Sequence, residues 1–530
     1  MTPHRNRHRR GLVAASLTAM IVLAAAACGG SDTEAPPSGS GSASSEQGEL
    51  LTVAKDTKPN SLNPAKANSH PNEWDDIALA YAPLLHINPD LSYSPGLAES
   101  WELDDENKNV TFTLRPDLKF ADGTPLTAKE AVASIQYWLD TSPASVSFAS
   151  AVTGVEATDD LTFVVEQSGP NPSILRVFSE NFYGGSIISP AGLADPQKLE
   201  TGSFGAGPYV LDTDATVPGS QYAYVPNPEY FDTSAQHFKN IVLKIVPAGA
   251  PQVQALQAGD VDLISVDGSN FTEVEAAGVL MSSGAPLAEF GVLLADRDGE
   301  LNPAIGNADV RRALIIGVDT AAVCQAVFGD TAVPSANWPV IDAQDPSLDE
   351  MYPYDEAKAK ELLDGAGYGD GFTVNLEMTA SPPIFSGIGQ AVAGYWKDLG
   401  VDVQITQSPE GVDSQTAQTE KKFETYAYGY GLLPAQLTAS SFLTPTGPGP
   451  FDPWETKNQE IEDLVASAPT LPEAESIAAY QEAFKIASED GWALNACQLQ
   501  SIYAANEKIT GWQVDDAAIP PYVTAIAPTD

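Results

Sequence analysis

The stretch from Gly96 to Trp138, GLAESWELDDENKNVTFTLRPDLKFADGTPLTAKEAVASIQYW, carries the clearest structural signals in the sequence. In segment 110–115 apolar Val, Phe and Leu alternate with Thr and Arg, which is the period of a half-buried strand. Pro-Asp at 116–117 and Asp-Gly at 122–123 predict two turns. The chain is therefore expected to leave a strand and reverse direction twice within a few residues.

A helix is expected to begin at Ala128, directly after these turns. Thr127 stands three residues before Glu130, which is the spacing at which a hydroxyl and a carboxylate cap a helix N-terminus reciprocally. Apolar residues then recur at helical spacing and predict one face that packs on a sheet. These elements carry no catalytic group, so residue by residue they are an ordinary α/β fragment. The apolar face consists of Ala131, Val132, Ile135, Trp138 and Leu139.

Taken together in order, these elements resemble the hallmark block of family 5 extracytoplasmic solute-binding proteins. The block consists of LAESW, the strand and LRPDLKFADGTPLTAKEAV. These are the oligopeptide, dipeptide and nickel type receptors of ABC importers. Further resemblance extends over nearly everything from Leu50 to about Trp512. It includes SLNPA at 61–65, GAGPYVL at 205–211, NPEYF at 227–231, DVRRAL at 309–314 and YPYDEAKAKELL at 352–363.

The resemblance implies an α/β fold with two lobes of the periplasmic-binding-protein type and an extra domain inserted in the first lobe. The length of 530 residues, which exceeds a single core, and the alternation of helices with strands after residue 290 agree with this. The expected divisions are a signal peptide at 1–27, a lipid-anchored flexible linker at 28–49, lobe 1 at 50–84 and 205–288, the inserted domain at 85–204, lobe 2 at 289–499, and a return to lobe 1 at 500–530.

The N-terminus predicts export. Basic residues precede an apolar stretch at 12–27, which fits a signal peptide and is too short for a membrane span. Three alanines directly before Cys28 resemble a bacterial lipobox, in which the cysteine takes a diacylglyceryl chain; a plain signal with Ala-x-Ala cleavage is the alternative. The secretory route is favoured over a twin-arginine signal at Arg9-Arg10. The protein is thus expected outside the cytoplasm, anchored to the outer face of the cell membrane by a lipid on Cys28 and joined to it by a flexible tether rich in Ser, Gly and Pro.

The charge of the chain argues against nucleic acid as a partner. All 71 acidic residues follow position 27, whereas four of the 26 basic residues precede it. The part from Cys28 onward keeps 22 basic residues and a formal charge of about −49. Phosphate would be repelled by such a surface.

Signals for catalysis, metals or cofactors are weak. After the signal peptide only His70, His86 and His237 remain, widely spaced, so no His-based metal site or nucleophile has local support. Asp260 and Asp262 form a lone D-x-D that is more typical of turns and caps. No cofactor, metal site or enzymatic activity is expected. A secreted hydrolase with a carboxylate pair remains the alternative class, although no pair stands out.

The resemblance implies a monomeric, lipid-anchored receptor whose lobes close on a solute and present it to an ABC permease in the membrane. Peptides, and oligopeptides first among them, are the expected ligands. An oligosaccharide or another small solute is the alternative.

Two loops bear on the ligand class. Dipeptide-binding relatives hold the peptide's ammonium with an Asp after a Trp-rich strand, and its carboxylate with an Arg before a lobe 2 helix. By resemblance these loops fall at 426–435 and 381–386, which contain no Asp and no Arg respectively. A buried peptide terminus without a counter-charge would cost several kcal/mol, so free dipeptides are poor candidates.

Aromatic residues are the candidate ligand contacts. Tyr426, Tyr428 and Tyr430 alternate on one strand face, while Trp74 and Trp338 are expected in loops near the cleft. Their rings and polar tips suit a neutral or weakly charged ligand. For the tyrosines, packing in a core is an equally weighted alternative, since aromatic residues of period two are common in buried strands.

Cys324 and Cys497 are the only other cysteines in this expected oxidising compartment. A disulfide between them and a pair of buried free thiols fit the sequence about equally, because sequence alone does not give their distance.

Overall fold

The structure is a computed structural model of the chain. It describes residues 47–67, 71–380, 383–409, 416–444, 454, 458–514, 519–520 and 522–529, and these belong to one compact unit. Cys28 and the expected signal peptide lie outside the described residues. The end of the expected linker already makes contacts, since Gln47 Nε2 donates to Gln236 O at 2.6 Å.

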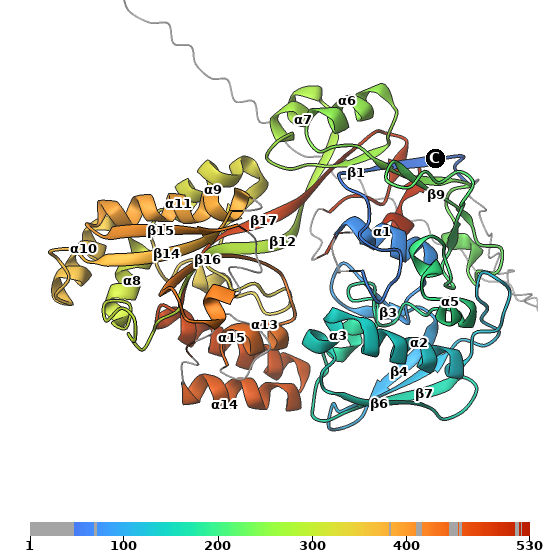
Figure 1. Ribbon diagram of the computed structural model, residues 1–530, viewed down its shortest axis with the longest axis horizontal. Coiled ribbons are helices and arrows are strands. Elements are labelled where there is room, and N and C mark those ends of the chain that lie inside the picture. The colour runs from blue at the N-terminus through green and yellow to red at the C-terminus, as the bar shows by residue number, and fades with distance from the viewer. Residues whose placement is uncertain are drawn as a thin grey trace, which may run out of the picture. The chain divides into compact units, whose positions relative to one another are not determined.

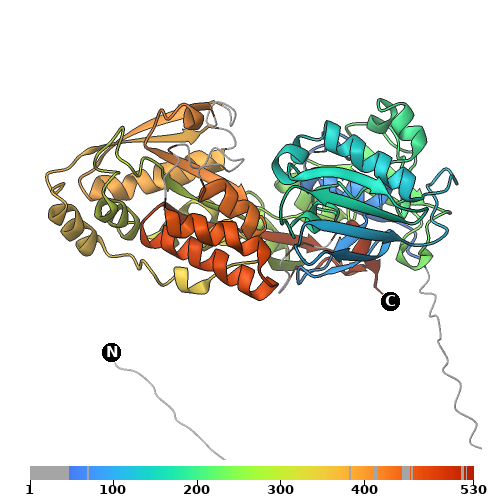
Figure 2. The same ribbon diagram turned by 90° about the horizontal axis from the view of Figure 1, so that it is seen from below.

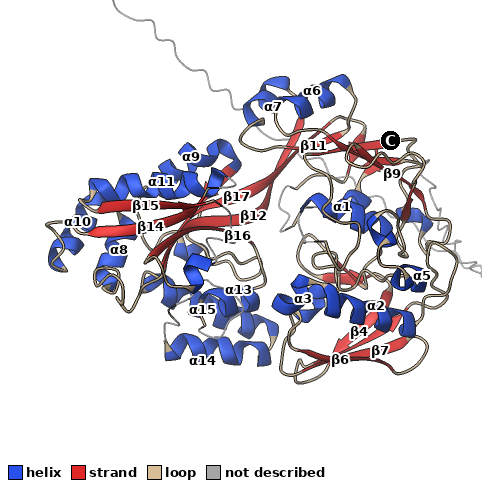
Figure 3. Ribbon diagram, viewed as in Figure 1, coloured by secondary structure: helices blue, strands red, loops and turns tan. Residues whose placement is uncertain are grey.

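A mixed sheet of eleven strands runs through the chain in the order β15-β14-β16-β12-β17-β11-β1-β10-β9-β8, with β13 beside β17 (Figure 3). The long antiparallel strands β12 and β17 connect its two halves (Figure 1). The bounds are β1 Leu51–Lys55, β8 Tyr209–Leu211, β9 Gln221–Pro226, β10 Ile241–Ile245, β11 Leu263–Ser265, β12 Leu280–Leu294, β13 Ala332–Pro334, β14 Thr373–Thr379, β15 Asp402–Ser408, β16 Thr425–Gly431 and β17 Ala493–Ala505.

Helices cover both faces of the half built from β14, β15, β16, β12 and β17. Along β12, Val292 and Leu294 enter the core beneath α8 to α11, whereas Leu293 enters the core beneath α13 to α15. Figure 1 shows α9 and α11 on one side of these strands and α13, α14 and α15 on the other. The bounds are α8 Ala308–Ile316, α9 Thr320–Phe328, α10 Glu356–Gly365, α11 Pro383–Asp398, α13 Ala435–Phe442, α14 Gln459–Ser467 and α15 Glu473–Glu489.

The stretch quoted first folds as predicted. Strand β5, Asn109–Leu114, buries its alternate apolar residues, and α2, Ala128–Thr141, begins at Ala128 with the expected capping box. Thr127 N donates to Glu130 Oε2 at 3.2 Å. The helix packs on a separate sheet in the order β4-β5-β7-β6, with β4 Ala98–Leu103, β6 Val152–Ala157 and β7 Thr162–Gln167 (Figure 2).

The remaining elements lie around β1 and its parallel neighbours β10 and β11, or pack with α2 and the β4-β5-β7-β6 sheet. The glycine-rich segment at 205–211 is needed here for a close approach. A Cβ on Gly207 would lie 2.5 Å from Leu79 O and 2.3 Å from Ala80 C. These elements are α1 Pro71–Ala80, β2 Leu85–Ile87, β3 Tyr93–Pro95, α3 Pro143–Phe148, α4 Ile174–Val177, α5 Pro190–Ala194, α6 Ala250–Ala258 and α7 Phe271–Ala277.

Asp262, which belongs to the D-x-D motif, holds β1 through hydrogen bonds. Its Oδ2 accepts from Thr52 N at 2.8 Å, and its Oδ1 accepts from Asn506 Nδ2 at 2.6 Å. Among the described residues no group of His, Cys, Asp and Glu is arranged to hold a metal. None of the described helices alone is long and apolar enough to cross a membrane; a bent pair, Ala308–Ile316 with Thr320–Thr331, would do so by length and composition only.

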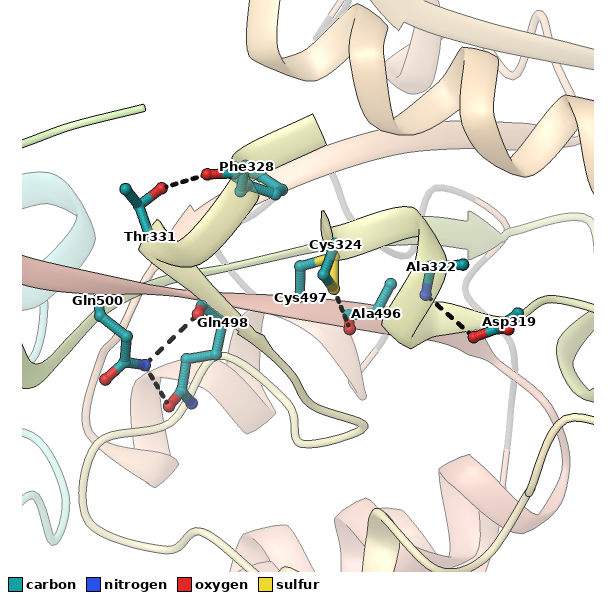
Figure 4. Close-up of a disulfide and its surroundings, with 9 residues drawn as sticks. All are labelled: Asp319, Ala322, Cys324, Phe328, Thr331, Ala496, Cys497, Gln498 and Gln500. Carbon is teal, nitrogen blue, oxygen red and sulfur yellow. Dashed lines mark hydrogen bonds between the residues drawn. A yellow bond between two sulfur atoms is a disulfide. The ribbon is translucent and has the colours of Figure 1, made fainter. Parts of the chain in front are cut away.

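A disulfide joins Cys324 of α9 to Cys497 of β17 (Figure 4). Their Cα atoms are 5.6 Å apart, and 173 positions separate them in the chain. Both side chains are buried in the core between β12, β17 and α9. The structure thus takes the bridged one of the two forms that the sequence left open.

Thiol counting is expected to find no free thiol at these two positions in the denatured, unreduced protein without its N-terminal cysteine. A bridge over so long a loop restricts the unfolded chain, so replacing both cysteines by serine is expected to lower the free energy of unfolding by about 2–5 kcal/mol. Chemical denaturation measures this loss. Two titratable thiols would rule out the bridge.

Candidate functional site

A cavity of about 270 Å³ lies at the carboxyl ends of the parallel strands β1 and β11. Ligands commonly bind at this edge of α/β sheets, because loops and helix ends meet there. The volume is near the lower end for small-molecule sites. Its lining includes Val53, Ala54 and Lys55 of β1 with Asp56 after it, Ser265 of β11 with Asp267 after it, Trp74 and Asp75 of α1, Leu499 to Tyr503 of β17, and Pro520, Tyr522, Val523 and Ile526.

One ion pair orders the polar wall of the cavity. Lys55 Nζ lies 2.8 Å from Asp75 Oδ2, and the two side chains are 12% and 17% exposed. The other oxygen of Asp75 accepts from Val523 N at 3.2 Å, which ties the C-terminal segment to α1. These contacts hold the carboxylate in a fixed position and leave Lys55 largely compensated.

The aromatic wall is built from Trp74 and Tyr522, whose ring centroids are 6.1 Å apart. Burial raises the pKa of Tyr522 well above its usual value, so the hydroxyl stays protonated and can donate. The indole Nε1 of Trp74 is buried and has no hydrogen-bond partner in the structure as described. An unpaired buried N–H is costly.

Acidic residues lie beneath this wall on α1. Asp76 is 2% exposed, and burial raises its pKa to about 7, while Tyr224, which donates to Asp76 Oδ1 at 2.6 Å, opposes the rise. Glu73 is fully buried and accepts from Asn60 N at 2.9 Å. These carboxylates position α1 and do not line the cavity.

Of the aromatic candidates from the sequence, the structure places only Trp74 in the cavity, and in helix α1 rather than in a loop. Trp338 is 1% exposed, and its Nε1 donates to Phe484 O at 3.2 Å and to Ser488 Oγ at 3.0 Å. The expectation that Trp338 contacts ligand is therefore corrected. It is a core residue, because α15 covers the loop that carries it.

The tyrosines of β16 do share one face, and that face is covered by α13 and α15. Tyr426 is fully buried, with its hydroxyl donating to Ala417 O at 3.1 Å, and Tyr428 is hydrogen-bonded to Asn495. Tyr430 is partly buried and packs edge-on against Phe442. The alternative of core packing is correct for Tyr426 and Tyr428, and Tyr430 contacts the same core.

Two charged residues that the sequence did not single out lie within electrostatic reach of each other. Arg176 of α4 is 5% exposed, and burial lowers the pKa of its guanidinium, while the hydroxyl of Tyr93 and the carboxylate of Asp342 oppose that change. Asp342 accepts from Ala435 N at 2.8 Å, beside the loop where a counter-charge was expected. Arg176 and Asp342 are 166 positions apart in the sequence, so no local pattern could have paired them.

Comparisons with known proteins agree on one family. Residues 92–449 match the family model described as bacterial extracellular solute-binding proteins, family 5 Middle. The "Probable peptide ABC transporter periplasmic-binding protein" of Sinorhizobium fredii is 29% identical over 343 residues, which are 60% of this chain and 62% of the relative. The periplasmic murein peptide-binding protein of Escherichia coli is 28% identical over 394 residues, 69% of this chain and 72% of the relative.

The fold also matches solved structures. HbpA2 from Haemophilus parasuis superposes with a TM-score of 0.78 at 22% identity, covering 91% of this chain and 100% of that one. At this identity the match shows the fold, and it confirms the expected two-lobed α/β architecture. The sequence match spans less than two thirds of the length of the Sinorhizobium relative.

Proposed function

Because the chain belongs to family 5 of the bacterial extracellular solute-binding proteins, we propose that it binds peptides, oligopeptides first, and delivers them to the permease of an ABC importer. The family match over residues 92–449 carries this proposal. The relatives in Sinorhizobium fredii and Escherichia coli, both named for peptides, support the ligand class. In this function the protein binds and releases its ligand without catalysis.

The proposed mechanism uses the cavity and the connecting strands. Residues from β1, β11 and the C-terminal segment line the cavity, while β12 and β17 continue into the other half of the sheet. A ligand that contacts both halves only when they close will favour the closed state by its differential affinity. The expected divisions into lobes and an inserted domain are part of this proposal.

Titration of the purified protein, followed by tryptophan fluorescence, tests the ligand class. Di-, tri- and longer peptides and oligosaccharides serve as probes, since an oligosaccharide receptor is the alternative. We expect saturable binding of tripeptides or longer peptides. Binding of oligosaccharides alone, or of a metal complex alone, would overturn the proposal.

We further propose that Cys28 carries a lipid that holds the protein on the outer face of the cell membrane as a monomer. A diacylglyceryl group supplies two chains, which is enough for stable attachment. The native protein should partition into detergent, and Cys28→Ser should release it into the medium. Equal partitioning of both forms in a Triton X-114 separation would refute the anchor.

A further inference from the structure

We propose that Arg176, with the hydroxyls of Tyr93 and Tyr522, forms a subsite for a carboxylate group of the ligand. This inference rests on the proposed function and deepens it, because it assigns an anionic group to the ligand. No loop that the sequence suggested for a counter-charge contains Arg176.

Arg176 is a buried residue whose guanidinium has no hydrogen-bond or ion-pair partner among the described residues. The residue is 5% exposed, and no hydrogen bond and no ion pair within 4.0 Å joins its side chain to any described residue. Two other arginines are buried: Arg297 stacks over the ring of Trp492, and Arg311 donates to Ile305 O at 3.0 Å and to Asp490 Oδ2 at 2.8 Å. A buried charge without a partner is strongly destabilising, so a structural arginine would be expected to resemble Arg311.

The surroundings of Arg176 come from three separate segments. Leu433 packs against the cluster that contains Ile174, Leu175 and Val177 of α4. Its carbonyl accepts from Ile341 N at 3.0 Å, and Asp342 follows directly. Asp342, Tyr93 and Tyr522 all lie within electrostatic reach of Arg176. Asp342 therefore lies within electrostatic reach of Arg176 without forming an ion pair with it.

The subsite adjoins the cavity through Tyr522, which lines the cavity and also interacts with the charge of Arg176. A guanidinium presents a planar fork of N–H donors that matches a carboxylate. The two tyrosine hydroxyls can donate to the same anion. Asp342, on a different segment, can accept an N–H group of the ligand beside that carboxylate. The C-terminal residue of a peptide, or an acidic side chain next to an amide, has this combination.

The first experiment uses simple anions and does not depend on peptide binding. Thermal unfolding of the purified full chain is measured in sodium acetate, sodium succinate and sodium chloride at equal ionic strength. We expect carboxylates to raise the Tm of the wild type by about 1–2 °C relative to chloride. Arg176→Met should lose this gain, because Met keeps the apolar stem without the charge.

Arg312→Met is the matched control. Arg312 is a half-exposed arginine that is paired with Asp309 at 3.0 Å, so its loss should leave the carboxylate gain intact. An equal gain in wild type and Arg176→Met, or no gain in the wild type, would overturn the subsite.

The second experiment compares trialanine with trialanine amide by calorimetry. The wild type should bind the free carboxylate about 10–100-fold more tightly, and Arg176→Met should bind both equally. If carboxylates stabilise the protein through Arg176 but trialanine does not bind, the peptide function fails and the subsite stands. If the wild type binds both forms of trialanine equally, the subsite fails and the peptide function stands.

Discussion

Replacing Trp338 by alanine is expected to lower the free energy of unfolding by about 3–5 kcal/mol. The side chain is 1% exposed and lies between Phe484 and Phe442, with centroid distances of 5.8 Å to each ring. Its removal leaves a cavity that helix α15 cannot fill, and it leaves Phe484 O and Ser488 Oγ without their donor. Urea denaturation of both proteins measures the loss.

The same variant should bind ligand normally under conditions in which it remains folded, since Trp338 does not line the cavity. Trp338→Phe is the conservative control and should recover most of the lost stability. A stable Trp338→Ala variant with weakened ligand binding would contradict the assignment of this residue to the core.

Replacing Trp74 by alanine is expected to weaken ligand binding and to change the stability of the fold only slightly. Trp74 lines the cavity, and its Nε1 has no partner in the described part of the chain. We therefore expect ligand affinity to fall by about 30-fold or more, as for an aromatic anchor at the centre of a binding site. The free energy of unfolding should change by only about 1–2 kcal/mol, since the side chain is partly exposed.

Isothermal titration calorimetry with a tripeptide measures the affinity without depending on tryptophan fluorescence. Trp101, a half-buried tryptophan of β4 that lies away from the cavity lining, provides the control variant Trp101→Ala. Unchanged affinity in Trp74→Ala would contradict the placement of the ligand in this cavity.

The sequence offered both tryptophans as ligand contacts, and the structure places only Trp74 at the cavity. Local features were predictable, because their causes lie within a few residues. The capping of α2 by Thr127 and Glu130 is confirmed, and so is the alternation along β5. The ordered blocks also led to the correct family and to the two-lobed fold.

The faces of strands were harder to assign. The period of two correctly placed Tyr426, Tyr428 and Tyr430 on one face of β16, but it could not show whether a helix covers that face. The cover comes from α13 and α15, which follow later in the chain. Burial of that kind is a tertiary property that periodicity does not contain.

The cavity could not be predicted from the sequence, because its lining residues are far apart in the chain. Its lining comes from segments as far apart as β1 and the residues around Tyr522. Arg176 and Asp342 lie within electrostatic reach of each other although they are 166 positions apart in the chain. Local sequence patterns hold no information on contacts between residues so far apart in the chain. The role proposed for Arg176 could therefore be inferred only from the fold.

Mass spectrometry of the compounds that co-purify with the full chain from its native host tests the central claim most directly. We predict peptides of three or more residues with free C-terminal carboxylates in the wild-type preparation. Trp74→Ala should lose them, while Trp101→Ala should retain them. An oligosaccharide or a metal complex in place of peptides, retained equally by all three proteins, would contradict the claim.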